Sequence, residues 1–310
     1  MPDRSVALVT FTDDGYFPLM EEMVRSFRRF PGAADVDVCV FHVGLSEERR
    51  ARLPDLVERH VEPDWPEDRD FLRGQPDRRK AFAVPPFIPE IFPGYDVYLW
   101  IDADCWVADW EGVALAIDTA REDGALAIAA TVDRAYGDGA PGVKLRWIAD
   151  RPAPPKMWMY KHARHILSPA EARAIAHKPI LNTGVWALPA GAPHWAAWAG
   201  YARRFWDARA IVGDQIALNL AIWRDGPAVR ILPAACNWLM AQALPMWDPD
   251  VRRLLEPQPP YRPISVAHLT EFKAERLDRS LTLAFPVKGG GVYHRTPRYD
   301  PDLDTPDFDS

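Results

Sequence analysis

The stretch Val97-Tyr-Leu-Trp-Ile-Asp-Ala-Asp104 is an apolar run of strand length that ends in two carboxylates. In an open α/β sheet, ligands bind at the carboxyl ends of the strands. Two residues apart on an extended backbone, Asp102 and Asp104 lie on the same side. There they can share one Mg²⁺ or Mn²⁺ and leave positions for phosphate oxygens. Alternatively, the two aspartates only close a turn after the strand. The rest of the sequence has to decide between a metal site and a structural turn.

Strand patterns alternate with helical patterns through the N-terminal half of the sequence. Ser5–Thr12 is a nearly continuous apolar run, which is typical of a parallel strand buried on both faces. Apolar residues then recur at helical spacing from Leu19 to Phe27. Further strands are predicted at 36–43, 97–101 and 126–130, with a helix from Ser46 to about Leu53 after the first of these. This order predicts an α/β fold in which helices flank a mostly parallel sheet.

The C-terminal half has a less regular pattern. Residues 131–167 mix Gly, Pro, Lys and Trp and predict a loop-rich region. Ser168 and Glu171 form a capping box that predicts a short helix to about Ala176. A strand is expected from Pro179, and Trp-rich helices at about 193–208 and 213–223. The end of the chain, 296–310, is acidic with little apolar content and predicts a disordered tail.

The composition excludes several classes of protein. The net charge of −7 argues against a protein that covers nucleic-acid phosphates, because such binding requires clustered Lys and Arg. No segment approaches the about 18 consecutive apolar residues of a transmembrane helix, and the start of the chain lacks a signal-peptide pattern. We therefore expect a cytoplasmic protein. Cys39, Cys105 and Cys236 form no CxxC pair and are expected to be small core residues.

Five segments resemble motifs of the GT-A glycosyltransferases, which use nucleotide-diphospho-sugar donors. They stand in the order found in glycosyltransferase family 8, which includes glycogenin and bacterial lipopolysaccharide galactosyltransferases. The first is the DxD segment, Asp102-Ala-Asp104. The others are Thr12-Asp-Asp-Gly-Tyr16, Asn182-Thr-Gly-Val185, Asp214-Gln-Ile-Ala-Leu-Asn219 and Val266-Ala-His268. Together the five segments span most of the chain.

The resemblance implies one Rossmann-like GT-A domain over residues 1–295, with a mostly parallel central sheet flanked by helices and a loop-rich acceptor region. Its nucleotide-binding half would cover about 1–130 and its acceptor half about 131–295. The implied activity is that of a metal-dependent hexosyltransferase. It would move a sugar from a nucleotide-sugar donor, expected to be a UDP-sugar, to a glycan or other hydroxyl acceptor with retention of configuration.

The resemblance also implies a metal site. Asp102, Asp104 and His268 would hold Mn²⁺ or Mg²⁺, and neutral imidazole is an acceptable third ligand beside two carboxylates. Read without the resemblance, a lone histidine is more often structural than metal-bound.

Donor-binding residues are expected at two places. At the first turn, Thr12 belongs to the resembling segment, Asp13 can accept a hydrogen bond from a base N–H, and Tyr16 offers a ring for stacking. The alternative is that Asp13 or Asp14 caps the following helix. Lys80 precedes the DxD strand and, by resemblance, would reach the donor diphosphate. A solvated basic cluster is its alternative.

Three polar residues are expected around the transferred sugar. By resemblance, Asn182, Asp214 and Gln215 are the catalytic-site residues, because amide and carboxylate groups can hydrogen-bond sugar hydroxyls. Alternatively, Asp214 caps the helix that begins there.

The sequence departs from family 8 in its late motif. The family pattern His-x-x-Gly-x-x-Lys is replaced by His268-Leu-Thr-Glu-Phe-Lys273, with the lysine one position early and Glu271 in place of the glycine. Lys273 is the candidate for contact with the diphosphate. Lys288, which precedes three glycines, competes with it.

Tryptophans provide candidates for sugar stacking, and two other functions compete with sugar transfer. Sugar-stacking candidates are Trp147, Trp158, Trp186 and Trp238, whereas Trp195, Trp198 and Trp206 recur at helical spacing and are expected in the core.

A sugar-1-phosphate nucleotidyltransferase would need a Gly-rich, Arg-containing loop after the first strand, which the sequence lacks. A non-catalytic nucleotide-sugar or glycan-binding protein remains the second alternative.

Overall fold

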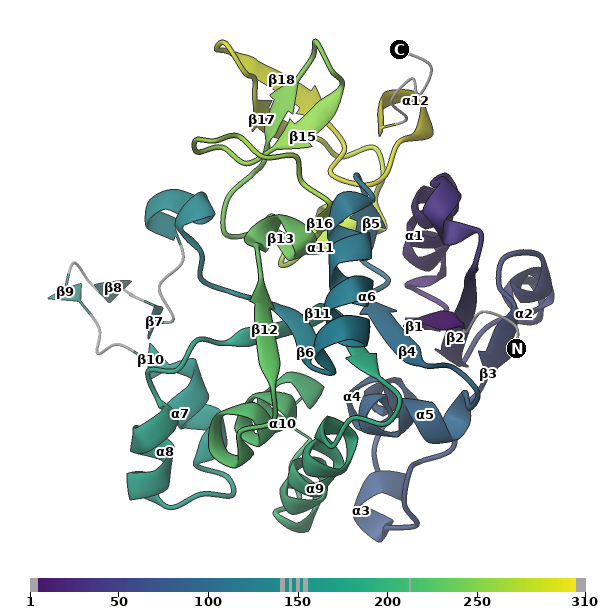
Figure 1. Ribbon diagram of the computed structural model, residues 1–310, viewed down its shortest axis with the longest axis vertical. Coiled ribbons are helices and arrows are strands. Elements are labelled where there is room, and N and C mark those ends of the chain that lie inside the picture. Colours follow the sequence, from purple (N-terminus) through teal and green to yellow (C-terminus); the bar gives the residue numbers. More distant parts are fainter. Residues whose placement is uncertain are drawn as a thin grey trace.

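A seven-stranded sheet forms the centre of the computed structural model, which describes residues 5–139, 143–144, 147–148, 151–152, 156–211 and 213–304 (Figure 1). Its strands in spatial order are β12 (Val229–Leu232), β6 (Leu126–Ala130), β11 (Leu181–Pro189), β4 (Val97–Ile101), β1 (Val6–Asp13), β2 (Val36–Val43) and β3 (Arg59–Val61). β11 runs antiparallel to both of its neighbours, and the other pairs are parallel. The predicted fold class, α/β with a mostly parallel sheet, is confirmed.

Side chains alternate between the two faces of the sheet and pack under different helices. On one face, Val6 and Leu8 of β1 pack in one core with α1 (Phe17–Arg28) and α6 (Glu111–Asp123). On the other face, Ala7 and Val9 belong to the core under α9 (His194–Asp207) and α10 (Asp214–Leu220). This period of two explains why the strand sequences are continuously apolar, since both faces are covered.

Shorter helices surround this framework. They are α2 (Glu47–Arg52), α3 (Asp70–Arg73), α4 (Lys80–Ala83), α5 (Ile88–Ile91), α7 (Trp158–Ala163) and α8 (Pro169–Ile175). The capping box predicted at α8 is present, because the side chains of Ser168 and Glu171 each accept a backbone N–H of the other. The region predicted as loop-rich, 131–167, contains α7 and short two-residue strands, β7 to β10. Among the described residues, no helix combines the length and apolarity that crossing a membrane requires.

A smaller sheet joins the DxD segment to the C-terminal part of the chain. β5 (Cys105–Val107) pairs with β16 (Val266–His268), which in turn pairs with β13 (Trp238–Leu239). Two further antiparallel pairs follow: β14 (Met246–Asp248) with β15 (Arg253–Leu255), and β17 (Leu283–Pro286) with β18 (Val292–Arg295). The last helices are α11 (Lys273–Leu277) and α12 (Pro301–Asp304). Cys39, Cys105 and Cys236 are buried and unpaired, as expected.

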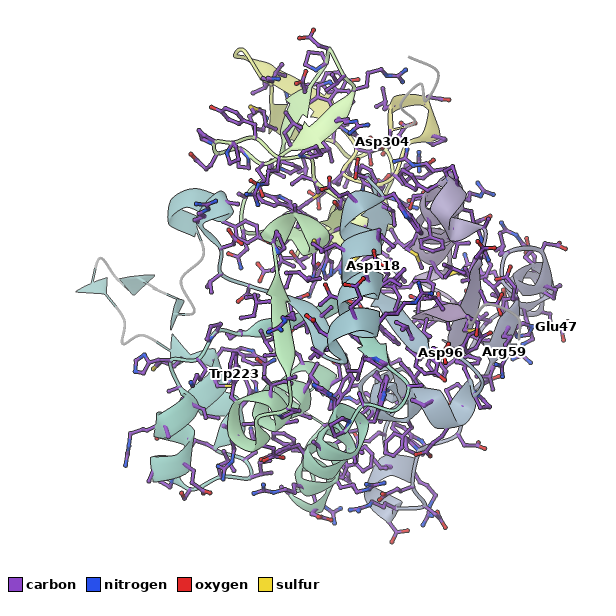
Figure 2. The ribbon with its side chains drawn as sticks, viewed as in Figure 1. Glu47, Arg59, Asp96, Asp118, Trp223 and Asp304 are labelled. Carbon is purple, nitrogen blue, oxygen red and sulfur yellow. The ribbon has the colours of Figure 1, made fainter. Side chains whose placement is uncertain are left out.

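The prediction of a disordered tail from 296 is wrong for residues 296–304. The two terminal guanidinium nitrogens of Arg295 donate to the carboxylate of Asp304, at 2.7 and 2.6 Å, and both side chains are buried. Asp304 is labelled in Figure 2. Arg298 donates to Glu22 of α1 at 2.7 and 2.9 Å. Charge-assisted bonds of this kind order a segment that has little apolar surface of its own. Residues 305–310 lie outside the described part of the chain.

Candidate active site

A cavity of about 510 Å³ opens at the carboxyl ends of β1 and β4. This is where ligands bind in open α/β sheets. Its lining combines four carboxylates, two arginines and several rings: Phe11, Asp13, Tyr16, Arg78, Arg79, Ala81, Phe82, Trp100, Asp102, Ala103, Asp104, Thr183 and Asp214. Acidic and basic groups therefore face one space that also has aromatic walls.

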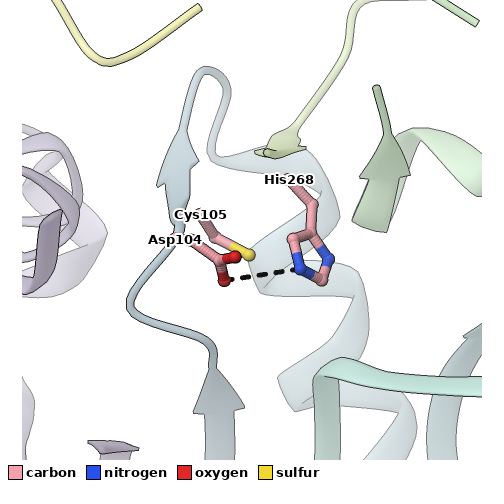
Figure 3. A group of neighbouring side chains, drawn as sticks. All are labelled: Asp104, Cys105 and His268. Carbon is pink, nitrogen blue, oxygen red and sulfur yellow. Dashed lines mark ion pairs between the residues drawn. The ribbon is translucent and has the colours of Figure 1, made fainter. Parts of the chain in front are cut away.

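The structure brings the three predicted metal ligands together. Asp102 and Asp104 follow β4, and His268 ends β16, which pairs with β5 directly after Asp104. Nε2 of His268 lies 3.5 Å from Oδ1 of Asp104 (Figure 3). The same nitrogen lies 3.7 Å from Oδ2 of Asp102. Asp102 is fixed by its own N–H, which donates to the carbonyl of Gly184 at 2.8 Å, and by the indole of Trp100, which donates to Oδ1 at 2.7 Å.

These side chains fit a hard divalent cation. The ligand atoms of Asp104, Cys105 and His268 lie within 4.8 Å of one another. Burial raises the pKa of the Cys105 thiol well above its ordinary value, so the thiol stays protonated and is a poor ligand. Two carboxylates and one imidazole remain, a donor set that suits Mn²⁺ or Mg²⁺.

Burial and the charges of neighbouring groups shift the pKa values of the cluster. Burial, with a contribution from the charge of Asp104, raises the pKa of Asp102 to about 6. Burial and the charge of Asp102 raise the pKa of Asp214 to about 7. Burial lowers the pKa of His268, but the hydrogen bond and charge of Asp104 outweigh that effect and raise it. A bound cation would supply the charge that protons supply here.

Asn182, Asp214 and Gln215 gather beside this cluster, as expected. Asp214 lines the cavity as the first residue of α10. Nδ2 of Asn182 donates to Oε1 of Gln215 at 3.3 Å. Sequence reasoning missed Asn237, which accepts a hydrogen bond from Nδ1 of His268 at 2.9 Å and donates to Asn182 at 2.8 Å. Nothing in the local sequence around Asn237 signals this contact.

Of the residues predicted to bind the donor at the turn after β1, two line the cavity and one does not. Asp13 and Tyr16 line the cavity, and Oδ1 of Asp13 also accepts the backbone N–H of Tyr16 at 2.9 Å. The alternative that Asp13 or Asp14 caps the helix is wrong, because the N-cap of α1 is Tyr16 and no described side chain accepts from its first turn. Thr12 is fully buried, and its hydroxyl donates to the carbonyl of Asp13 at 3.1 Å. Asp14 faces away from the cavity toward α2, where it pairs with Arg49 at 2.9 Å.

The lysines predicted to reach the diphosphate do not line the cavity. Lys80 is buried, with Nζ 3.1 Å from Asp77. Lys273 is exposed on α11. Lys288 donates to Asp248 at 2.6 Å. Among the described residues, the basic side chains that line the cavity are those of Arg78 and Arg79.

Three arginines reach the cavity or its carboxylates. Arg78 and Arg79 line it immediately before α4. Arg276 of α11 donates to Oδ2 of Asp104, and its guanidinium lies 5.7 Å from the ring centre of Tyr16. Glu271, which stands in place of the family's glycine, has φ of 67°, in the left-handed region that favours glycine. The turn before α11 therefore keeps a backbone conformation typical of glycine.

The expected tryptophan surfaces are largely in the core. Trp186 and Trp238 are fully buried, so they do not stack on a ligand. Trp158 is half-buried on α7, and the side chain of Trp147 lies outside the described residues. Trp195, Trp198 and Trp206 are buried, as expected. Trp100, which sequence reasoning assigned only to a strand, lines the cavity and stacks on Trp186 with ring centres 6.0 Å apart.

Comparisons with known proteins identify relatives by structure. No protein-family model and no curated protein matches the sequence. The apo structure of WbbM, a bifunctional glycosyltransferase, matches 79% of this chain with a TM-score of 0.50 and 17% identity. The chain spans about 40% of the length of WbbM. This likeness shows the fold alone.

Two further structures are similar at lower TM-scores. The galactosyltransferase LgtC, in complex with donor and acceptor sugar analogs, matches 87% of this chain and 93% of its own, with a TM-score of 0.47 and 16% identity. The glycosyltransferase GlyE of Streptococcus pneumoniae matches 76% of this chain and 47% of its own, with a TM-score of 0.41 and 17% identity.

Proposed function

We propose that this protein is a metal-dependent glycosyltransferase of GT-A type, most similar to family 8, that transfers a hexose from a UDP-sugar. The observation that carries this proposal is a single cavity lined by Asp102, Asp104, Arg78 and Arg79. Nε2 of the buried His268 lies within 3.7 Å of both of these carboxylates. A nucleoside diphosphate bound to a divalent cation carries the charges that such a cavity complements.

The donor would lie along the cavity from the first turn to α10. Tyr16 stacks on the base, and Asp13 accepts a hydrogen bond from it. Arg78 and Arg79 contact the diphosphate, which arginine can bind through two parallel hydrogen bonds. We assign to Arg276 the role expected for Lys273, because Arg276 already contacts Asp104.

Catalysis in this proposal is charge neutralisation and orientation. Asp102, Asp104 and His268 hold the cation, which when bound offsets the charge that develops on the leaving diphosphate. Asp214, Gln215 and Asn182 orient the sugar through its hydroxyls. In a retaining transfer, the acceptor attacks the face that the diphosphate has just left. A diphosphate oxygen can take the acceptor proton, so no fixed base is required.

The acceptor would bind in the half that begins at residue 131. From the other half of the chain, Phe82 adds a ring surface, since it lines the cavity and is 45% exposed. Trp158 keeps its proposed role at the acceptor side, since it is half-buried on α7. Sugars stack on aromatic faces while their hydroxyls bond to polar neighbours.

Thermal unfolding with UDP, GDP and ADP, each with and without Mn²⁺, tests the donor assignment. We expect Mn²⁺-dependent stabilisation by UDP of about 2.7 kcal/mol at a hundredfold excess over Kd. The stabilisation should be smaller at pH 5 than at pH 7.5, because Asp102 has a pKa of about 6 and a proton then competes with the cation. Equal stabilisation with and without Mn²⁺ would contradict the metal assignment, and no stabilisation by any nucleotide would contradict the donor site.

A further inference from the structure

A continuous row of side-chain amides joins α10 to the candidate metal ligand His268. Oε1 of Gln215 accepts from Nδ2 of Asn182 at 3.3 Å. Oδ1 of Asn182 accepts from Nδ2 of Asn237 at 2.8 Å, and Oδ1 of Asn237 lies 2.9 Å from Nδ1 of His268. We call these three amides, Gln215, Asn182 and Asn237, the amide relay.

The direction of every hydrogen bond in the amide relay is set by two backbone groups that can only donate. The N–H of Gly184 donates to Oδ1 of Asn182 at 2.9 Å, and the N–H of Thr183 donates to Oε1 of Gln215 at 3.3 Å. The oxygen of Asn182 therefore faces Asn237, and Asn237 must donate to it through its NH₂ group. The oxygen of Asn237 is then left facing the imidazole, where it can only accept.

The imidazole consequently carries its proton on Nδ1. Nε2 faces Asp102 and Asp104, so when a cation replaces the proton on this nitrogen, its lone pair points to where the two carboxylates lie. Asn237 and His268 are 1% and 4% exposed, so water cannot easily replace the amide as the partner of Nδ1. Metal-bound histidines are held in this way by a partner on the other ring nitrogen, which fixes both the tautomer and the ring orientation.

We propose that Asn237 is a positioning residue that holds His268 as the Nδ1–H tautomer, so that Nε2 is available to a divalent cation. The inference rests on the proposed function, because it assigns the residue that prepares the same metal site. It extends that site beyond its direct ligands, to the short helical turn Ala234–Asn237 and to strand β11.

Two substitutions at Asn237 separate positioning from a merely structural role. Asn237→Leu has a similar volume but cannot accept from Nδ1, whereas Asn237→Asp still accepts from Nδ1 while losing its bond to Asn182. Free Mn²⁺ is measured by electron paramagnetic resonance during titration of each folded variant, with no nucleotide or sugar present. We expect Asn237→Leu to raise the Kd for Mn²⁺ by about 10- to 100-fold and Asn237→Asp to leave it within about tenfold.

The outcomes distinguish the inference from the proposed function. If Asn237 served only as a buried polar side chain, Asn237→Asp would raise the Kd for Mn²⁺ more than Asn237→Leu, because the aspartate places a charge against Oδ1 of Asn182. The inference would be overturned if Asn237→Leu bound Mn²⁺ with wild-type affinity. It would also be overturned if Asn237→Asp lost as much Mn²⁺ affinity as Asn237→Leu. Either result would leave the metal site intact. Should Asn237→Leu not fold, Asn237→Asp decides: a Kd within about tenfold supports positioning and a larger loss contradicts it. A wild-type protein that binds no Mn²⁺ contradicts both.

Discussion

Asp104→Asn is expected to lower Mn²⁺-dependent release of UDP from a UDP-sugar by at least about a thousandfold while the protein stays folded. The substitution preserves shape but removes a negative charge from the centre of the proposed metal site. A loss of about 4 kcal/mol of transition-state stabilisation corresponds to this factor. Stability should change less, because the lost pairing with Arg276 is partly offset by relief of the repulsion between Asp104 and Asp102.

A neighbouring aspartate provides the matched control for this prediction. Asp109 also forms an ion pair, with Arg253 at 3.1 Å, but does not line the cavity among the described residues. Its amide variant, Asp109→Asn, can still accept the backbone N–H of Glu111. We expect Asp109→Asn to keep activity within about twofold, since Asp109 does not line the cavity and the amide keeps the side chain's shape. Full activity in Asp104→Asn would remove the metal assignment.

Gly184→Ala is expected to disrupt the site through a single methyl group. A Cβ at this position would lie 2.3 Å from Cε1 and 2.6 Å from Nδ1 of His268, and 2.9 Å from Oδ1 of Asn182. The imidazole is buried and cannot retreat without losing its approach to Asp104 or its bond to Asn237. We expect Mn²⁺ affinity to fall by about 10- to 100-fold. The free energy of unfolding should fall by about 1 to 3 kcal/mol.

Gly200→Ala distinguishes this steric effect from a general effect of replacing glycine. Gly200 lies inside α9, and nothing stands within 4 Å of its added Cβ. Alanine is favoured over glycine by about 1 kcal/mol within a helix, so this control should raise the free energy of unfolding and leave Mn²⁺ affinity unchanged. Mn²⁺ binding by Gly184→Ala at wild-type affinity would show that His268 is not a ligand.

The strands of the central sheet could be predicted because each is covered on both faces. Val97–Ile101 and Leu126–Ala130 are continuous apolar runs, and such runs have few other stable solutions in a chain of this size. The antiparallel direction of β11 could not be predicted, because an apolar pattern reads the same in both directions. Helices α4 and α5 were missed since prolines stand between and within them, in positions where proline tolerates the start of a helical turn.

The candidate site was predictable where its chemistry follows a strand end. Asp102 and Asp104 were identified from the strand end and His268 from the resemblance, and the fold brings the three together. The basic residues of the site could not be predicted from the sequence, because the side of α11 that faces Asp104 depends on how this five-residue helix is rotated about its axis. That rotation directs Arg276 to the carboxylate and leaves Lys273 exposed. Asn237 could not be found from sequence, since its partner lies 31 residues away.

Release of a nucleoside diphosphate from purified nucleotide sugars, followed with Mn²⁺ and after its removal by a chelator, tests the central claim most directly. The proposed function predicts that one nucleotide sugar, a UDP-hexose, is slowly hydrolysed without acceptor, that release requires Mn²⁺, and that Asp104→Asn abolishes it. Tight Mn²⁺-dependent binding of that nucleotide sugar without any release, also in the presence of hydroxyl acceptors, would contradict the claim and identify a binding protein instead.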